Sequence, residues 1–296
     1  MSMSNKNRPV VPIPPSYNQN QDLETDSTTK YVKFLDKNNI KTIMTTAGTS
    51  QFNLLTKEET ILFNQAVVKG FSGNILVGVP PLSQKHTTEY IKDFESRLNS
   101  EEKERVNFLI LYPDRFYNKE VLINYFTSIR LSATNPIYIH GNPIRNGKGG
   151  SWDYRPDLVN ELGSDVIAGL KEECSDLKYS YNFIQKLNPG FDIIVAGGSM
   201  RRYEFLKNAG ANAFLSGIGN FFPKIELEYF NDERSAIKAE NDIFEVFMSI
   251  GWHASLRYAL RHLGFTCFND RQPWPNLTDS EKTRIINVLK EYSDEQ

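Results

Sequence analysis

Short apolar runs alternate with longer amphipathic stretches along most of the chain. The apolar runs are continuous, which is typical of parallel strands that are buried on both faces. We expect eight such strands, at residues 10–13, 42–46, 74–79, 107–112, 136–140, 166–171, 192–196 and 213–216. Helical spacing predicts helices after them, at residues 28–38, 57–69, 87–98, 119–129, 156–162, 177–187, 200–209 and from Pro223.

Eight strand-then-helix units predict parallel strands joined by right-handed crossovers. They favour an α/β fold, a (β/α)8 TIM barrel over residues 1–223, with a C-terminal helical region over 224–296. An open, doubly wound sheet is the alternative, because closure of a barrel cannot be read from sequence. In the C-terminal region we expect helices at 224–250, 254–262 and 280–291.

Composition narrows the function classes. The chain has 296 residues, is 40% hydrophobic and carries a formal net charge of -2. It lacks the basic stripe that nucleic acids or anionic membrane surfaces attract, so we expect neither as a partner. Two cysteines and a polar N-terminus without an apolar signal segment favour a reduced, cytoplasmic setting.

Two candidate catalytic residues close predicted strands, where a TIM barrel carries its active site. Lys171 ends the sixth strand, and burial there disfavours the charged form of its amine. A neutral amine attacks a ketone, so Lys171 is a candidate Schiff-base nucleophile, or a lysine that reaches solvent at the rim. His140 ends the fifth strand and is either a proton-transfer group or a structural histidine.

Loops after three strands hold candidate carboxylate contacts. Thr49 and Ser50 follow the second strand, where hydroxyl and N–H groups can bind a carboxylate, or simply form a turn before a helix capped by Thr56. Arg145 follows the fifth strand and can grip a carboxylate with two hydrogen bonds, although most loop arginines are solvated. Gly197 opens a turn before a helix, which is an anion site or an ordinary turn.

The spacing of residues in the chain does not match the motifs of phosphate-binding loops, metal sites or serine nucleophiles. Gly141 and Gly147 are separated by five residues instead of the four of a phosphate-binding loop, and Gly149 stands where that loop has a hydroxyl. The four histidines and two cysteines show no metal-binding spacing, and there is no Gly-x-Ser-x-Gly nucleophile elbow.

Five segments, in order and correctly spaced, resemble the dihydrodipicolinate synthase and N-acetylneuraminate lyase family of class I aldolases. They are GTSQFNLLTKEE at 48–59, PIYIHGNPIRNG at 136–147, VIAGLKEECSDL at 166–177, AFLSGIGNFFP at 213–223 and RQPWPNLTDSEK at 271–282. The third is similar to the family's Schiff-base segment, I-x-G-I-K-E-x-x-x-D/N-L. The resemblance runs nearly end to end.

The resemblance implies a homotetramer or homodimer of barrels, with no cofactor and no metal. It implies that Lys171 condenses with pyruvate or another 2-oxo acid. Thr49 and Ser50 correspond to the family's Thr-Thr pair, which holds the substrate carboxylate and joins the proton relay. Arg145 matches the arginine near the site entrance. Gly197 and Leu215 match backbone positions that line the lysine pocket.

The chain departs from the family in the proton relay. His140 stands in place of the tyrosine that acts as general acid and base, and Gly141 in place of the following asparagine. Pro113-Asp114-Arg115 replaces Pro-Tyr-Tyr, so the relay tyrosine supplied across the dimer is missing; Tyr112 or Tyr117 could replace it only with a shifted loop. Gln51-Phe52 replaces Gly-Glu. Tyr138 shares a strand face with His140 but lies one layer deeper.

These patterns predict a Schiff-base lyase with Lys171 as nucleophile, His140 as acid and base, Thr49 in the relay, and Ser50 and Arg145 as carboxylate contacts. Two alternatives stay open. The chain could be a non-catalytic member of the family that binds a 2-oxo acid as a sensor or structural subunit, or an unrelated barrel enzyme that uses His140 alone. The second substrate and the direction of reaction are not specified by the sequence.

Overall fold

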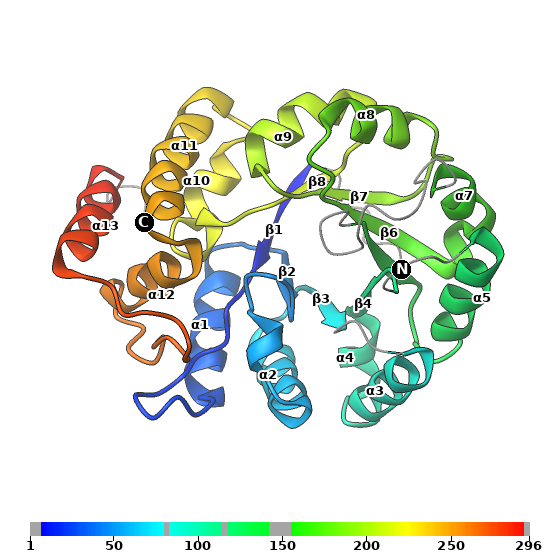
Figure 1. Ribbon diagram of the computed structural model, residues 1–296, viewed down its shortest axis with the longest axis horizontal. Helices are drawn as coiled ribbons and strands as arrows, with labels where there is room; N and C mark the ends of the chain where they lie inside the picture. The colour runs from blue at the N-terminus through cyan, green and yellow to red at the C-terminus, as the bar shows by residue number, and fades with distance from the viewer. Residues whose placement is uncertain (1–6, 80–82, 114–117, 142–154, 293–296) are drawn as a thin grey trace. The chain divides into compact units, whose positions relative to one another are not determined.

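The computed structural model describes residues 7–79, 83–113, 118–141 and 155–292. Its eight parallel strands form a closed barrel in chain order (Figure 1). The strands are β1 (Arg8–Pro12), β2 (Thr42–Thr45), β3 (Asn74–Val79), β4 (Val106–Leu111), β5 (Ile137–Gly141), β6 (Ile167–Glu172), β7 (Asp192–Val195) and β8 (Ala213–Leu215). The predicted TIM barrel is confirmed, and the open sheet is excluded.

Helices follow the strands as the periodicity predicts. They are α1 (Thr25–Lys37), α2 (Lys57–Gly70), α3 (Gln84–Ser96), α5 (Lys119–Arg130), α7 (Arg155–Val166), α8 (Leu177–Gln185) and α9 (Ser199–Leu206). A further short helix, α4 (Ser100–Glu104), was not predicted; Asn99 and Glu102 stabilise it through a capping box. The predicted cap of α2 is confirmed, because Thr56 and Glu59 form another capping box.

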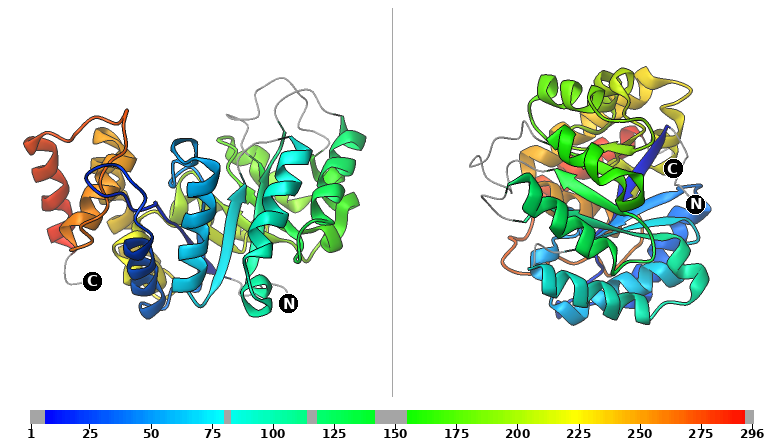
Figure 2. Two further views of the ribbon diagram at one scale, coloured as in Figure 1. Left: turned by 90° about the horizontal axis from the view of Figure 1, so that it is seen from below. Right: turned by 90° about the vertical axis from the view of Figure 1, so that its right-hand side faces the viewer.

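The chain forms two compact units. Of the described residues, the first comprises those within 7–10 and 74–215, and the second those within 11–73 and 216–292. Within the first unit, α5 and α7 lie side by side outside the strands, and α8 lies beside α9 (Figures 1 and 2). The division of the chain at residue 223 into a barrel and a helical region stays a prediction.

The predicted helix at 224–250 is wrong in one respect, because it is two helices, α10 (Pro223–Glu228) and α11 (Glu233–Ile250). The backbone N–H groups of Asn231 and Asp232 donate to the Glu228 carbonyl and end α10. The Asp232 side chain then accepts the Ser235 N–H and begins α11.

The remaining C-terminal helices are α12 (Trp252–His262) and α13 (Asp279–Glu291), and both lie beside α11 (Figure 1). Within the described ranges, no helix combines the length and the apolar character that a membrane crossing requires.

Two buried carboxyl groups, one on α10 and one on α11, interact electrostatically. The side chain of Glu226 is fully buried, and that of Glu240 is 1% exposed. Burial, and next the negative charge of Glu240, raise the pKa of Glu226 well above its usual value. Glu226 therefore holds a proton in the folded protein at pH values where the unfolded chain has lost it.

Replacement of this carboxyl should change how stability depends on pH. Because the folded-state pKa of Glu226 is raised, its contribution is fully present below the unfolded value near 4.5 and is lost as pH rises through the folded value. Urea denaturation gives the change in the free energy of unfolding that Glu226→Gln causes relative to the wild type. We expect this change to be more favourable at about pH 8 than at about pH 5, by about 1 kcal/mol or more. Glu228→Gln, an exposed change on the same helix, is the control. An identical effect of Glu226→Gln at both pH values would contradict the argument.

Candidate active site

The two candidate catalytic side chains lie on neighbouring strands. In the parallel register of β5 and β6, His140 is the partner of Lys171. Both are near the carboxyl ends of their strands, and both are buried, with exposed fractions of 5% and 3%. Lys171 Nζ lies 3.0 Å from His140 Nε2. The structure therefore brings together the predicted nucleophile and the predicted acid and base.

A third side chain, which was not predicted, completes this cluster. Glu173 follows β6, and its Oε2 lies 2.8 Å from Lys171 Nζ and 2.7 Å from His140 Nε2. Its side chain is 28% exposed. Although burial raises the pKa of Glu173, the positive charge of Lys171 and the hydrogen bond from His140 hold it well below its usual range. Glu173 is therefore the negative charge of the site.

A signal for Glu173 was present in the sequence. Side chains of a strand alternate between its two faces, so residues 171 and 173 are on one face and 172 is on the other. Two consecutive glutamates after a strand-end lysine thus indicate one carboxylate beside the amine and one facing away.

Glu172 is the carboxylate that faces away, and it lies in a packed cluster behind the site. Its Oε2 accepts a 2.8 Å hydrogen bond from Arg155, and its Oε1 accepts one from the hydroxyl of Ser180. Both members of the ion pair are completely buried, and the Arg155 guanidinium lies 4.2 Å from the ring centre of Phe183. Although burial lowers the pKa of Arg155, Glu172 raises it above its usual value. Glu172 thus has a structural role in the packing behind the site.

This cluster explains one departure from the family pattern. A Cβ atom added to Gly141 would lie 2.1 Å from Nη2 of Arg155, which is too close for any side chain. The asparagine that the family pattern has at this position would therefore displace the arginine. Gly141 accommodates the buried ion pair behind the site.

The turn after β7, which contains Gly197, lies beside Glu173. A Cβ added at Gly197 would be 3.6 Å from Cγ of Glu173, and the backbone there has a positive φ of 77°. The hydroxyl of Ser199 donates a 2.7 Å hydrogen bond to the Leu215 carbonyl. The two predicted pocket-lining positions are therefore connected through one turn.

Two tyrosines near the candidate site, Tyr138 and Tyr112, contact other groups. The Tyr138 side chain is fully buried, and its hydroxyl donates to Asp192 at 2.8 Å, beside the ion pair of Asp192 with Arg8. Tyr112 is 4% exposed and packs edge-on against Phe126. Tyr138 is thus held below the site, as its position on the strand predicts.

Thr49 and Ser50 belong to the second compact unit. The Ser50 hydroxyl is fully buried and donates a 2.6 Å hydrogen bond to the Ile13 carbonyl. The Ser50 N–H donates to the Ala47 carbonyl, so the two donors of this residue bind the carbonyls of Ile13 and Ala47. Thr49 is half-buried. The roles of both residues as carboxylate contacts stay predictions.

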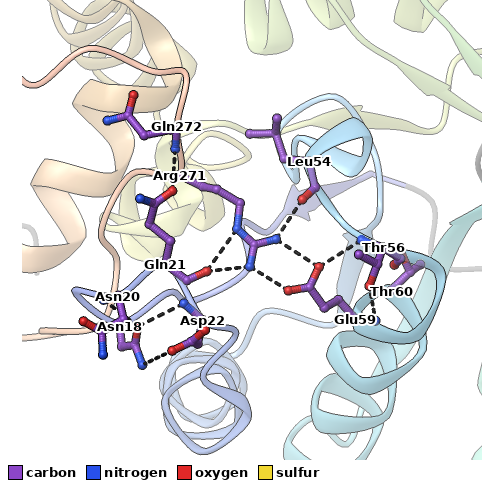
Figure 3. Close-up of polar contacts among 10 residues, drawn as sticks. All are labelled: Asn18, Asn20, Gln21, Asp22, Leu54, Thr56, Glu59, Thr60, Arg271 and Gln272. Carbon is purple, nitrogen blue, oxygen red and sulfur yellow. Dashed lines mark hydrogen bonds and ion pairs between the residues drawn. The ribbon is translucent and has the colours of Figure 1, made fainter.

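Two arginines of the C-terminal region hold this loop within the second unit. Arg257 is 1% exposed and donates from Nε and Nη2 to the side-chain oxygen of Gln51, whose backbone has a left-handed φ of 49°. Arg271 pairs with both oxygens of Glu59 and also donates to the Leu54 carbonyl (Figure 3). The hydrogen bond from Arg271 is the main cause that lowers the pKa of Glu59.

Some predicted positions cannot be placed. Arg145, Asp114, Arg115 and Tyr117 lie outside the described residues. In the ranges that are described, no three histidine, cysteine, aspartate or glutamate side chains are grouped so that they could hold a metal ion.

Comparison with known proteins supports the resemblance. No protein-family model matches the chain. The chain is 26% identical over 235 residues to the 4-hydroxy-tetrahydrodipicolinate synthase of Staphylococcus epidermidis, which covers 78% of this chain and 75% of that protein. Its fold is similar to that of Proteus mirabilis N-acetylneuraminate lyase, with a TM-score of 0.81, 15% identity, and coverage of 97% of this chain and 99% of the other.

A third relative is a variant of the 2-keto-3-deoxygluconate aldolase of Sulfolobus solfataricus, solved as a pyruvate complex. The TM-score is 0.78 at 15% identity, and the match covers 96% of this chain and 95% of the other. The five ordered motifs, the closed barrel with its C-terminal helices and these relatives agree. The chain is similar in sequence to 4-hydroxy-tetrahydrodipicolinate synthases and shares the fold of the dihydrodipicolinate synthase and N-acetylneuraminate lyase family, from which it diverges in sequence.

Proposed function

We propose that this protein is a Schiff-base-forming lyase that condenses or cleaves pyruvate or another 2-oxo acid through Lys171. The observation that carries the proposal is the placement of the Lys171 amine. It is buried at the carboxyl end of a barrel strand, 3.0 Å from a histidine and 2.8 Å from a carboxylate. An amine in such a setting can exchange its proton with a neighbour and attack a carbonyl carbon.

The chemistry of a 2-oxo acid fits this arrangement. Nζ of Lys171 forms a bond to the C2 carbon, and loss of water leaves a protonated imine. The imine withdraws electrons from C3, so that a C3 proton is removed, or the C3–C4 bond is broken, more easily. His140 is the group that we assign to proton transfer at C3, because an imidazole exchanges protons near neutral pH. The variant aldolase that was solved with pyruvate supports this class of substrate.

The proposal extends to the surroundings of the site. Thr49, Ser50 and Arg145 are its carboxylate contacts, and no cofactor or metal takes part. The protein acts in the cytoplasm as a homotetramer or homodimer.

Borohydride reduction tests the nucleophile. Reduction in the presence of pyruvate should add the reduced pyruvate unit to Lys171, as located by peptide mass mapping, because borohydride traps the imine as a stable amine. Lys171→Met should abolish the adduct, whereas Lys178→Met, an exposed change on α8, should leave it in place. Absence of an adduct at Lys171 with pyruvate and with a panel of other 2-oxo acids would refute the proposal.

Proton exchange at the pyruvate methyl group tests His140. In deuterated water, NMR should show exchange catalysed by the wild-type protein, because the imine makes the methyl protons acidic. His140→Ala should slow this exchange by about 10²–10⁴-fold, the usual contribution of a general acid or base. His86→Ala, an exposed change on α3, should have no effect. Binding of pyruvate without exchange would instead favour a non-catalytic sensor or structural subunit.

A further inference from the structure

We propose that Glu173 is a catalytic residue of this site, which takes a proton from Lys171 before the amine attacks and returns it to the hydroxyl group that leaves as water. The inference rests on the proposed Schiff-base function. It assigns to Glu173 and His140 the proton transfers for which the family pattern uses tyrosines, and both groups come from the same compact unit of one chain.

The hydrogen bonds determine which group holds which proton. Glu173 Oε2 is within 2.8 Å of Lys171 Nζ and 2.7 Å of His140 Nε2, and the two nitrogens are 3.0 Å apart. A carboxylate only accepts hydrogen bonds, so both nitrogens donate to it. While Glu173 is ionised, His140 Nε2 therefore carries a proton and cannot accept one from Lys171 at this stage. The direct path for the lysine proton leads to Glu173.

A backbone hydrogen bond to the end of β5 holds Glu173 in this position, next to Gly197. Its N–H donates a 3.1 Å hydrogen bond to the Gly141 carbonyl, which connects it to the end of β5. Gly197 lies alongside and contributes no side chain, so the carboxylate is not covered there. Its 28% exposure leaves it accessible to a small substrate, in contrast to Glu172, which is completely buried against Arg155.

The proton count balances with this single carboxylate. A proton passes from the Lys171 ammonium to Glu173, and the neutral amine forms the N–C2 bond while the carbonyl π electrons move to oxygen. A proton then moves from the new N–H₂⁺ group to that oxygen and gives a carbinolamine. Glu173 returns its proton to the hydroxyl, the C–O bond breaks, and the nitrogen lone pair forms the C=N bond. An ammonium ion and a ketone thus become an iminium ion and water.

The negative charge of Glu173 stabilises both the first and the last state of this reaction. The site starts with an ammonium next to a carboxylate and ends with an iminium next to the same carboxylate. Opposite charges at hydrogen-bond distance stabilise each other most where water is partly excluded. Glu173 therefore stabilises the protonated imine as well as the resting lysine.

Trapping kinetics test this role. Glu173→Gln keeps the size of the side chain but cannot accept a proton from an ammonium group. We expect the rate of borohydride-trapped adduct formation with pyruvate to fall by about 10²-fold or more, the usual contribution of a general acid or base. In this variant the rate should also rise with pH, because solvent must then remove the lysine proton. Glu161→Gln, the same change at the exposed end of the ion pair with Lys119, should leave the rate unchanged.

A second variant separates chemistry from structure. Glu173→Ala opens space next to the amine, and added formate should restore part of its trapping rate by supplying the missing carboxylate. Formate should not accelerate the wild-type protein. A merely structural role of Glu173 predicts no such rescue.

Two results would overturn the inference in distinguishable ways. Equal trapping rates and equal pH profiles for Glu173→Gln and the wild type would remove Glu173 from the mechanism while the Schiff base stands. Lack of rescue by formate in a folded Glu173→Ala protein that still forms the adduct slowly would likewise count against proton transfer. Absence of any adduct in the wild type would instead refute the proposed function, and the role of Glu173 with it.

Discussion

An ammonium group buried in the wall of a barrel loses its hydration, and that loss has to be offset by a nearby negative charge and by hydrogen-bond acceptors. Lys171 is only 3% exposed, and Glu173 supplies the charge at 2.8 Å. The other features of the site follow from this constraint. His140 binds the same carboxylate oxygen, and the strand register places it directly beside the lysine.

Two consecutive glutamates have opposite roles because a strand alternates its faces. Glu173 faces the lysine and is partly accessible, whereas Glu172 faces the surrounding helices and is completely buried with Arg155. Breaking such a buried pair leaves an uncompensated charge, which typically costs about 3–5 kcal/mol. The pair therefore holds α7 against β6 and requires glycine at position 141. Glu172 thus stabilises the packing behind the strand, whereas its neighbour Glu173 contacts the candidate nucleophile.

The barrel was predictable because each strand is a local pattern. The bounds of β3 were predicted as observed, and the other strands were predicted to within two residues. The long helix predicted at 224–250 was wrong because helical periodicity continues across a break that the hydrogen bonds of Asp232 and Glu228 create. The short helix α4 was missed because its five residues are too few to show a period.

The sequence by itself determined that Lys171 and His140 end neighbouring strands, because apolar runs and family motifs are properties of contiguous residues. It also determined that Tyr138 lies one layer below His140. Only the tertiary structure decided that Tyr138 binds Asp192, that Arg155 fills the space beside Gly141, and that Glu173 contacts both candidate catalytic side chains. The physical reason is that these contacts depend on strand register and side-chain direction. Both are set when strands from distant parts of the chain pack together, and neither leaves a pattern in local sequence.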